Sequence, residues 1–393
     1  MTERYYLNAL GMINALGVGK AAVGAGLFAG DTSGMQPQEG YLFDQKVMAG
    51  AVAQALPEIT GDLAGYDSRN NRMLLVAMQE IEGDIRTAID KYGPDRVAVI
   101  LGTSTSGISD NEPGIAEKVK SGSFPEGFDY NRQDNASLAL FARSYFGLSG
   151  LAMTISTACT SSAKTLASAR RMMAAGLCDA AIVGGADTLC RLTMNGFASL
   201  DLLSPELCNP FSQNRNGINI GEGAAVFLMS REPSSVRIAG IGETSDAYHM
   251  STPDPEGLGA LNAMHQALDQ SGFTPEDIAY LNLHGTATEL NDSVEAKAVY
   301  ELLGAVPCSS TKPLTGHTLG AAGSTELGFL WLALKSEAGM LPPHIWDEVV
   351  DPELPPLKLV PTGMAGSDAR AMMTNSFAFG GNNISVILSK EGE

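Results

Sequence analysis

The chain has 393 residues, of which 44% are hydrophobic and 18% are charged, and this ordinary globular composition argues against disorder, collagen and charged coiled coils. With 44 acidic and 25 basic residues it carries a formal charge of −19, which repels phosphate backbones and anionic membranes, so neither nucleic acid nor a membrane is an expected partner. At this length we expect two domains, or one large domain made of two similar halves.

In chain order, the pattern predicts a strand over 96–104, a helix over 160–176, strands over 180–187 and 278–285, a helix over 292–303, a short strand over 306–311, a long helix over 320–338, and two final strands joined by a Phe-Gly-Gly turn. Apolar strands that alternate with helices are typical of buried sheets covered by helices, an α/β architecture. The segment 230–237 is the most linker-like and separates a longer from a shorter half. The sequence alone shows no duplication of these halves.

The cysteine spacing and the N-terminal stretch bear on the cellular compartment in which the protein is expected. The five cysteines are scattered, and no two have the short spacing of a metal knuckle or a redox pair. The N-terminal stretch, which asparagines and glycines interrupt, is a poor secretory signal, and no run of ~18 apolar residues occurs. We therefore expect a reduced, soluble, cytoplasmic protein.

The motif TACTSS places Cys159 between a short β-branched run and a predicted helix. A cysteine at the N-terminus of a helix faces unpaired N–H groups and the positive end of the helix dipole, which stabilise its thiolate. Small residues on both sides permit the sharp turn that an exposed nucleophile needs. A buried structural cysteine is the alternative interpretation.

Two histidine motifs follow in the second half. His284 ends a predicted strand in LNLHGTATELND, whereas Lys312 and His317 lie in a Gly/Thr-rich loop, STKPLTGHTLGAAG, with Glu326 in the next helix. Each group alone could be structural. One cysteine and two histidines, all at junctions between strands and loops, form a coherent set for acyl-thioester chemistry.

Taken together, these motifs resemble those of the elongating β-ketoacyl-[acyl carrier protein] synthases, the synthase I and II type of condensing enzymes in fatty-acid and polyketide synthesis. TACTSS is similar to the nucleophile motif, HGTATELND to the first histidine motif and STKPLTGHTLGAAG to the lysine–histidine motif. Three further signatures occur in matching order: NPFSQNRNGINIGEGAAVFLM, SDAYHMSTPDP and NSFAFGGNN. The resemblance covers essentially the whole chain.

The resemblance implies a thiolase fold, in which two similar βαβαβαββ halves form five αβαβα layers. Residues 1–235 would form the half that carries the nucleophile, and 236–393 the half that carries both catalytic histidines. No cofactor and no metal are implied. The implied partner is acyl-carrier protein, and the implied assembly is a homodimer or a heterodimer with a ketosynthase-like subunit.

The resemblance also implies roles for the matched residues. Cys159 would accept an acyl chain as a thioester, after which malonyl-carrier protein would lose carbon dioxide and its carbanion would attack that thioester. His284 and His317 would stabilise the enolate, and Lys312 with Glu326 would order the two histidines. The N–H groups of Cys159 and Phe379 would form the oxyanion hole, and Phe379 would act as a gate that opens once the cysteine is acylated.

Some residues depart from the common pattern. Ser162 and Lys164 stand where glycine and histidine are usual, Ala378 where glycine precedes the gating phenylalanine, and Asn382 where threonine is common. The catalytic groups are intact, so these changes leave open the range of chain length, the gate motion and the pathway, whether primary fatty-acid or specialised polyketide or polyene synthesis.

Two other functions of the same fold class compete with this one. A thiolase would need a second cysteine as acid and base, and a non-catalytic chain-length subunit would lack the nucleophile. The chain has Cys159 and no cysteine after Cys308, which disfavours both. The sequence leaves open that this chain is the active half of a heterodimer.

Carrier protein is acidic, so a synthase of charge −19 must gather its basic residues where the carrier docks. Arg69 and Arg72 are three residues apart in a predicted helix that resembles the carrier-docking helix of the family. We predict docking there, with Arg132 as a second site. A solvated helix start is the alternative.

Overall fold

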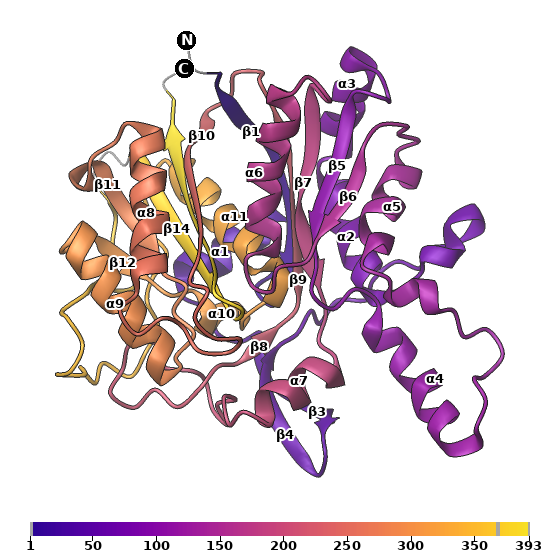
Figure 1. The fold of residues 1–393 in the computed structure, drawn as a ribbon, viewed down its shortest axis with the longest axis horizontal. Coiled ribbons are helices and arrows are strands. Elements are labelled where there is room, and N and C mark those ends of the chain that lie inside the picture. The colour runs from indigo at the N-terminus through magenta and orange to yellow at the C-terminus, as the bar shows by residue number, and fades with distance from the viewer. Residues whose placement is uncertain (1–2, 367–369, 392–393) are drawn as a thin grey trace.

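Two sheets of the same topology form the frame of the computed structural model, which describes residues 3–366 and 370–391 (Figure 1). The sheet of the first half has the spatial order β6-β5-β7-β9-β1. Its strands are β1 (Tyr5–Asn14), β5 (Val97–Gly102), β6 (Ala152–Ile155), β7 (Ala180–Asp187) and β9 (Gly223–Ser230).

The sheet of the second half has the order β12-β11-β14-β15-β10. Its strands are β10 (Val236–Ser245), β11 (Ile278–Asn282), β12 (Pro307–Ser309), β14 (Ala371–Ala378) and β15 (Asn382–Lys390). In each half, the second strand lies between the third and the fourth and runs parallel to both. The fifth strand lies between the fourth and the first and is antiparallel to both. The structure therefore contains the duplication that the sequence alone does not show.

The two first strands, β1 and β10, join the sheets edge to edge. They pair in antiparallel fashion at Tyr5 with Ile238 and at Tyr6 with Arg237. The segment between Ser230 and Val236, predicted as a linker, is the connection from the first sheet to the second. We propose that the two halves divide at residues 235 and 236.

Helices cover both sheets and fill the space between them, which confirms the five-layered αβαβα arrangement (Figure 1). The outer layers consist of α2 (Arg69–Glu80), α3 (Glu82–Tyr92) and α5 (Ala136–Tyr145) on the first sheet, and α8 (Leu258–Ser271) and α9 (Glu289–Leu303) on the second. The central layer holds α1 (Lys20–Ala29), α6 (Ser161–Ala174) and α11 (Ala322–Leu334). Helix α11 is apolar on nearly all sides because it packs between the two sheets.

Most of the remaining elements lie at the ends of the strands where the site forms; the exceptions are a 3₁₀ turn that directly precedes β11 and a two-residue strand that pairs with β12 at the edge of the second sheet. The remaining elements are β2 (Gly17–Val18), β3 (Met35–Leu42), β4 (Gln45–Gly50), η1 (Gly61–Tyr66), α4 (Ile108–Ser121), η2 (Tyr130–Gln133), α7 (Arg191–Ala198), β8 (Ile220–Gly221), η3 (Pro275–Asp277), α10 (Lys312–Thr315), η4 (Leu319–Ala321) and β13 (Lys358–Leu359). Strands β3, β4 and β8 form a separate small sheet. Figure 1 shows α4 projecting away from the body.

The predicted elements agree closely with the observed ones. The strand predicted over 180–187 coincides with β7, and the two final strands are β14 and β15. Helix α9 begins at Glu289, three residues before the predicted start. Helix α11 is shorter than predicted at both ends, since its first two predicted residues belong to the turn η4 and it ends at Leu334 rather than at residue 338. Within the described ranges, none of the helices has the length and apolar character needed to cross a bilayer.

Candidate active site

Cys159, His284 and His317 meet at a buried point between the two halves. His317 Nε2 lies 2.9 Å from Cys159 Sγ, and the two imidazole rings lie 5.4 Å apart, edge to face. The sulfur and one nitrogen of each ring all lie within 4.8 Å of one another. The structure thus brings together the three groups that the sequence motifs singled out.

The turn between β6 and α6 positions the cysteine. Ala158 adopts a left-handed conformation with φ 53°, which is uncommon for a residue with a Cβ atom, and Cys159 follows it directly. The Ser161 hydroxyl fastens the turn, since it donates to the carbonyl of Ala158 at 2.6 Å and accepts from the N–H of Thr157 at 2.9 Å. The nucleophile therefore lies on a tightly held backbone.

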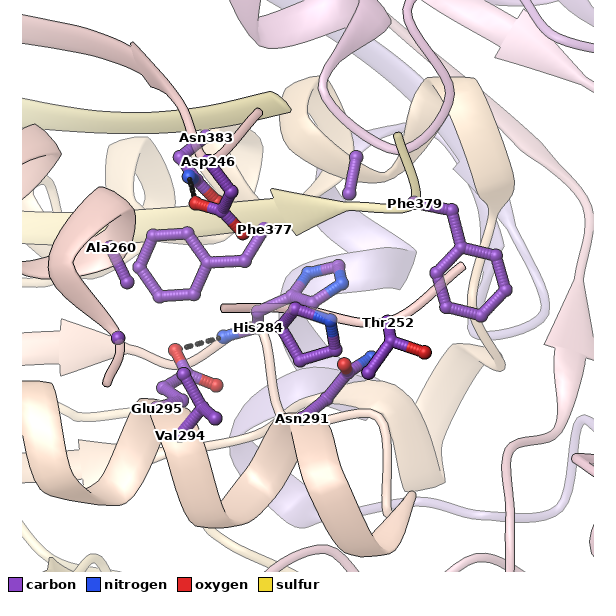
Figure 2. Close-up of a pocket in the computed structure, with 13 residues that line it drawn as sticks. Asp246, Thr252, Ala260, His284, Asn291, Val294, Glu295, Phe377, Phe379 and Asn383 are labelled. Carbon is purple, nitrogen blue, oxygen red and sulfur yellow. Dashed lines mark hydrogen bonds between the residues drawn. The ribbon is translucent and has the colours of Figure 1, made fainter. Parts of the chain in front are cut away.

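His284 is held by a buried carboxylate that the sequence analysis missed. Glu295, on α9, accepts hydrogen bonds from the N–H groups of His284 and Gly285, both at 2.8 Å. Figure 2 shows His284 between the side chains of Phe377 and Phe379, beside a small cavity. The loop after β11 is thus fixed to α9 by a side chain that resembles an ordinary surface acid in the sequence.

Lys312 connects the two histidine loops. Its ammonium donates to Oε1 of Glu326 at 2.7 Å and also to the backbone carbonyl of His284. Lys312 is 1% exposed and Glu326 3%, so the ion pair is shielded from water. The His317 N–H donates to the carbonyl of Asn219 at 2.7 Å, which ties that loop to the residues before β8.

Burial decides the resting protonation of the site. Burial, together with the charge of Lys312, holds the pKa of His284 and of His317 well below the usual value, so both rings are neutral near pH 7. Burial also raises the pKa of Cys159 to about 12, with Lys312 and the Phe379 N–H acting in the opposite direction. The resting group is therefore a thiol hydrogen-bonded to a neutral imidazole, rather than the free thiolate expected from the helix N-terminus.

Phe379 lies at the start of the turn between β14 and β15. The N–H groups of Phe379 and of Cys159 both act to lower the pKa of the Cys159 thiol, against the larger effect of burial. Gly380 and Gly381 have φ values of 82° and 72°, which glycine adopts without strain. The ring of Phe379 packs against Phe197, with the ring centroids 5.6 Å apart.

The arginines predicted to dock the carrier lie outside this cluster. Arg69 donates to both oxygens of the buried Glu222, at 2.5 and 2.9 Å, and Arg72 donates to Asp67 at 2.5 and 2.7 Å. Arg132 lies in η2 and is partly buried. Internal carboxylates thus occupy Arg69 and Arg72, which the sequence analysis took as free charges. A role in carrier binding stays a prediction.

A second carboxylate that the sequence analysis missed is Asp187, at the end of β7. It accepts hydrogen bonds from the N–H groups of Ser104, Thr105 and Gly320, and so joins the end of β5 to the turn before α11. An acid that closes the buried run AAIVGGAD is the signal that could have indicated it. Asp187 helps to fix the nucleophile half against the histidine half.

A cysteine and two histidines are also a donor set that zinc accepts. The expected absence of a metal stays a prediction.

Two family models match the chain. Residues 37–234 match the N-terminal domain of beta-ketoacyl synthase and residues 236–346 match its C-terminal domain. Among curated proteins, the chain is 31% identical to 3-oxoacyl-[acyl-carrier-protein] synthase 2 of Staphylococcus aureus (strain COL), over 82% of each chain. It is also 31% identical to the synthase 2 of Synechocystis, over 80% of each chain.

Solved structures resemble the whole chain. A structure of a ketosynthase in complex with its chain length factor, from Xenorhabdus doucetiae, includes a chain with 43% identity and a TM-score of 0.94, and the match covers 99% of this chain and 98% of that one. The ishigamide ketosynthase/chain length factor matches at 28% identity, with a TM-score of 0.89 over 99% of this chain and 100% of the other.

Proposed function

Because this chain belongs to the β-ketoacyl synthase family, we propose that it condenses a malonyl group with an acyl group held on Cys159, both supplied by acyl-carrier protein. The observation that carries the proposal is the buried contact of 2.9 Å between His317 Nε2 and Cys159 Sγ, with His284 beside it. A nucleophile in contact with a neutral imidazole suits acyl transfer.

In the first half-reaction, the Cys159 sulfur attacks the thioester carbonyl of the acyl-loaded carrier protein, while the proton of the Cys159 thiol passes to His317 Nε2. The N–H groups of Cys159 and Phe379 stabilise the oxyanion of the tetrahedral intermediate. Collapse of the intermediate breaks the bond to the carrier sulfur, which takes the proton from His317. The products are an acyl-enzyme and a free carrier thiol.

In the second half-reaction, His284 and His317 donate hydrogen bonds to the thioester carbonyl of malonyl-carrier. Neither Nδ1 atom has a partner in the part of the chain that the structure describes, so each ring can carry its proton on Nε2 in this step. For His317 this is the other neutral tautomer from the one that accepts the Cys159 proton in the first half-reaction. Breaking the bond to the carboxylate releases carbon dioxide and leaves an enolate. Its carbon attacks the acyl-enzyme, the bond to Cys159 breaks, and the thiolate takes up one proton.

Lys312 supports this chemistry without touching the substrate. Its positive charge helps to keep both histidines neutral, so that they donate without being charged themselves, and the same charge favours the negative enolate. Glu326 holds the ammonium in place. Lys312 and Glu326 are therefore positioning residues.

We further propose that the chain is the catalytic subunit of a heterodimer with a chain-length-factor-like protein. The specific observation in favour is the 43% identity to a chain of the Xenorhabdus complex, compared with 31% to the curated synthases. The alternative is a homodimer in primary fatty-acid synthesis. Co-expression with a candidate partner, followed by measurement of the mass of the purified assembly, distinguishes the two.

A thiolase is not favoured, because its second cysteine would have to lie beside the first. Among the described residues, the cluster around His284 and His317 contains one cysteine, Cys159. We place the reaction in the cytoplasm, where the five free cysteines stay reduced.

The test is to mix the purified protein, or its co-purified assembly, with acyl-carrier and malonyl-carrier and to follow the β-ketoacyl product and carbon dioxide. The proposal expects both from the unmodified protein and no product from Cys159→Ala. Product formation by the variant, or no product from the unmodified protein with any acyl-carrier or partner, would contradict it.

A further inference from the structure

Lys164 is a half-buried cation on α6 whose side chain reaches the turn that carries Phe379. Its ammonium donates to Oδ1 of Asn382 at 3.1 Å. Glu243, the acid that faces it, is paired with Arg171, and no carboxylate forms an ion pair with Lys164 within residues 3–366 and 370–391. Burial lowers the pKa of Lys164, so this ammonium depends on its hydrogen bond to Asn382 more than an exposed lysine would.

Asn382 is the first residue of β15 and follows Gly381 directly. Phe379 lies at the other end of the same short turn, and its N–H group acts to lower the pKa of the Cys159 thiol. A contact at Asn382 therefore restrains the short turn that carries Phe379, three residues away.

Lys164 is also rigidly connected to the nucleophile. It lies five residues after Cys159, on the helix that begins where the cysteine turn ends. Two backbone bonds hold the Phe379 turn to a different segment: Gly380 N–H donates to the carbonyl of Met250 and Asp246 N–H to that of Gly381, both at 2.8 Å. The Lys164 bond fastens the turn to α6 instead.

We propose that Lys164 and Asn382 form a latch that holds the Phe379 turn over Cys159 and thereby limits malonyl decarboxylation to the acylated enzyme. The inference rests on the proposed function. Acylation converts the sulfur into a poor acceptor for the Phe379 N–H and places new atoms beneath the turn. The Lys164–Asn382 bond opposes opening both before and after acylation. Before acylation it adds to the contact of the turn with the free thiol, so weakening it lets the turn open on the unacylated enzyme more often.

The measured quantity is the ratio of carbon dioxide released to β-ketoacyl product formed, with malonyl-carrier and acyl-carrier as substrates. In Lys164→Met and in Asn382→Ala this ratio should rise about fivefold, the scale of one lost hydrogen bond in a two-state equilibrium. The double variant should match the single ones, because all three lack the same bond. Asn382→Asp, which turns the contact into an ion pair, should lower the ratio.

Arg170→Met is the matched control, since it removes a cation from the same helix at a residue that contacts Gln270 rather than the turn. Its ratio should equal that of the unmodified enzyme. If a substitution only destabilised the protein, carbon dioxide release and product formation would slow together and their ratio would stay unchanged. That result, or additive effects in the double variant, would overturn the latch proposal. If Lys164→Met does not fold, the opposite shifts expected of Asn382→Ala and Asn382→Asp decide the question. An unmodified enzyme that forms no product contradicts the proposed function instead.

Discussion

The ammonium of Lys312 lies 2.7 Å from Oε1 of Glu326, and both side chains are almost completely buried. The pair lies behind the two histidines rather than in contact with the nucleophile. Because the same ammonium also binds the carbonyl of His284, it links the positions of both histidine loops to α11. The charge in the site thus comes from a residue whose ammonium contacts Glu326 and the His284 carbonyl rather than the nucleophile.

The pH dependence of decarboxylation tests this role. Burial and Lys312 lower the pKa of both histidines, so neither ring should produce an acidic limb as the pH falls from 8 to about 6, where a solvated imidazole of pKa about 6.5 would already be largely protonated. Burial raises the pKa of Glu326 to about 7, so a small change of rate in this range would report that carboxyl rather than the histidines. In Lys312→Met one of the lowering causes is lost, and an acidic limb should move up towards pH 6.5. Identical profiles for the two enzymes would remove the electrostatic role of Lys312.

The two histidines should differ in the first half-reaction. His317→Ala should slow acylation of Cys159, because His317 is the ring in contact with Sγ, whereas His284→Ala should slow it much less. Both variants should lose decarboxylation by a factor on the order of 10² or more, the scale for loss of an oxyanion donor. Mass-detected acylation and release of labelled carbon dioxide measure the two steps separately. Normal release by both variants would contradict the enolate-stabilising role.

Gly102 allows the nucleophile turn to pack against β5. A Cβ atom at this position would lie 2.5 Å from the N atom of Ser162, closer than any real contact. Gly102→Ala should therefore destabilise the fold by about 1–3 kcal/mol and slow acylation. Gly196→Ala is the control, because its Cβ atom would meet nothing within 4 Å. Chemical denaturation and the acylation rate provide the two readouts, and equal behaviour of the two variants would contradict the packing argument.

Substitutions at Arg69 test its contribution to stability, and a substitution at Arg132 tests carrier docking. The side chain of Glu222 is 2% exposed, so Arg69→Gln should leave a buried carboxylate unpaired and lower stability by about 1–3 kcal/mol, a range reduced because Arg69 itself is partly exposed. Arg72→Gln, whose pair with Asp67 is more exposed, should cost less than about 1 kcal/mol.

The docking prediction is tested at Arg132. Arg132→Glu should raise the KM for carrier-bound substrate and leave a small thioester unaffected. Equal losses on both substrates would move the docking surface elsewhere.

Strands, helices and motifs that depend on neighbouring residues could be predicted from the sequence, whereas contacts between residues far apart in the chain could not. The strand at β7 was evident from its continuous apolar run, and Cys159, His284 and His317 stood out because each lies at a junction with small residues. The duplication of the halves appears only in the strand order, which non-local pairing sets. Arg69 looked like a free charge because its partner, Glu222, lies 153 residues away in the sequence.

Acylation of Cys159 is measured by mass spectrometry of the intact protein after incubation with a set of acyl-loaded carrier proteins. We expect one added acyl group, located by peptide mapping on Cys159, and no added mass on Cys159→Ala. An acyl group on another residue, or unchanged acylation of Cys159→Ala, would contradict it.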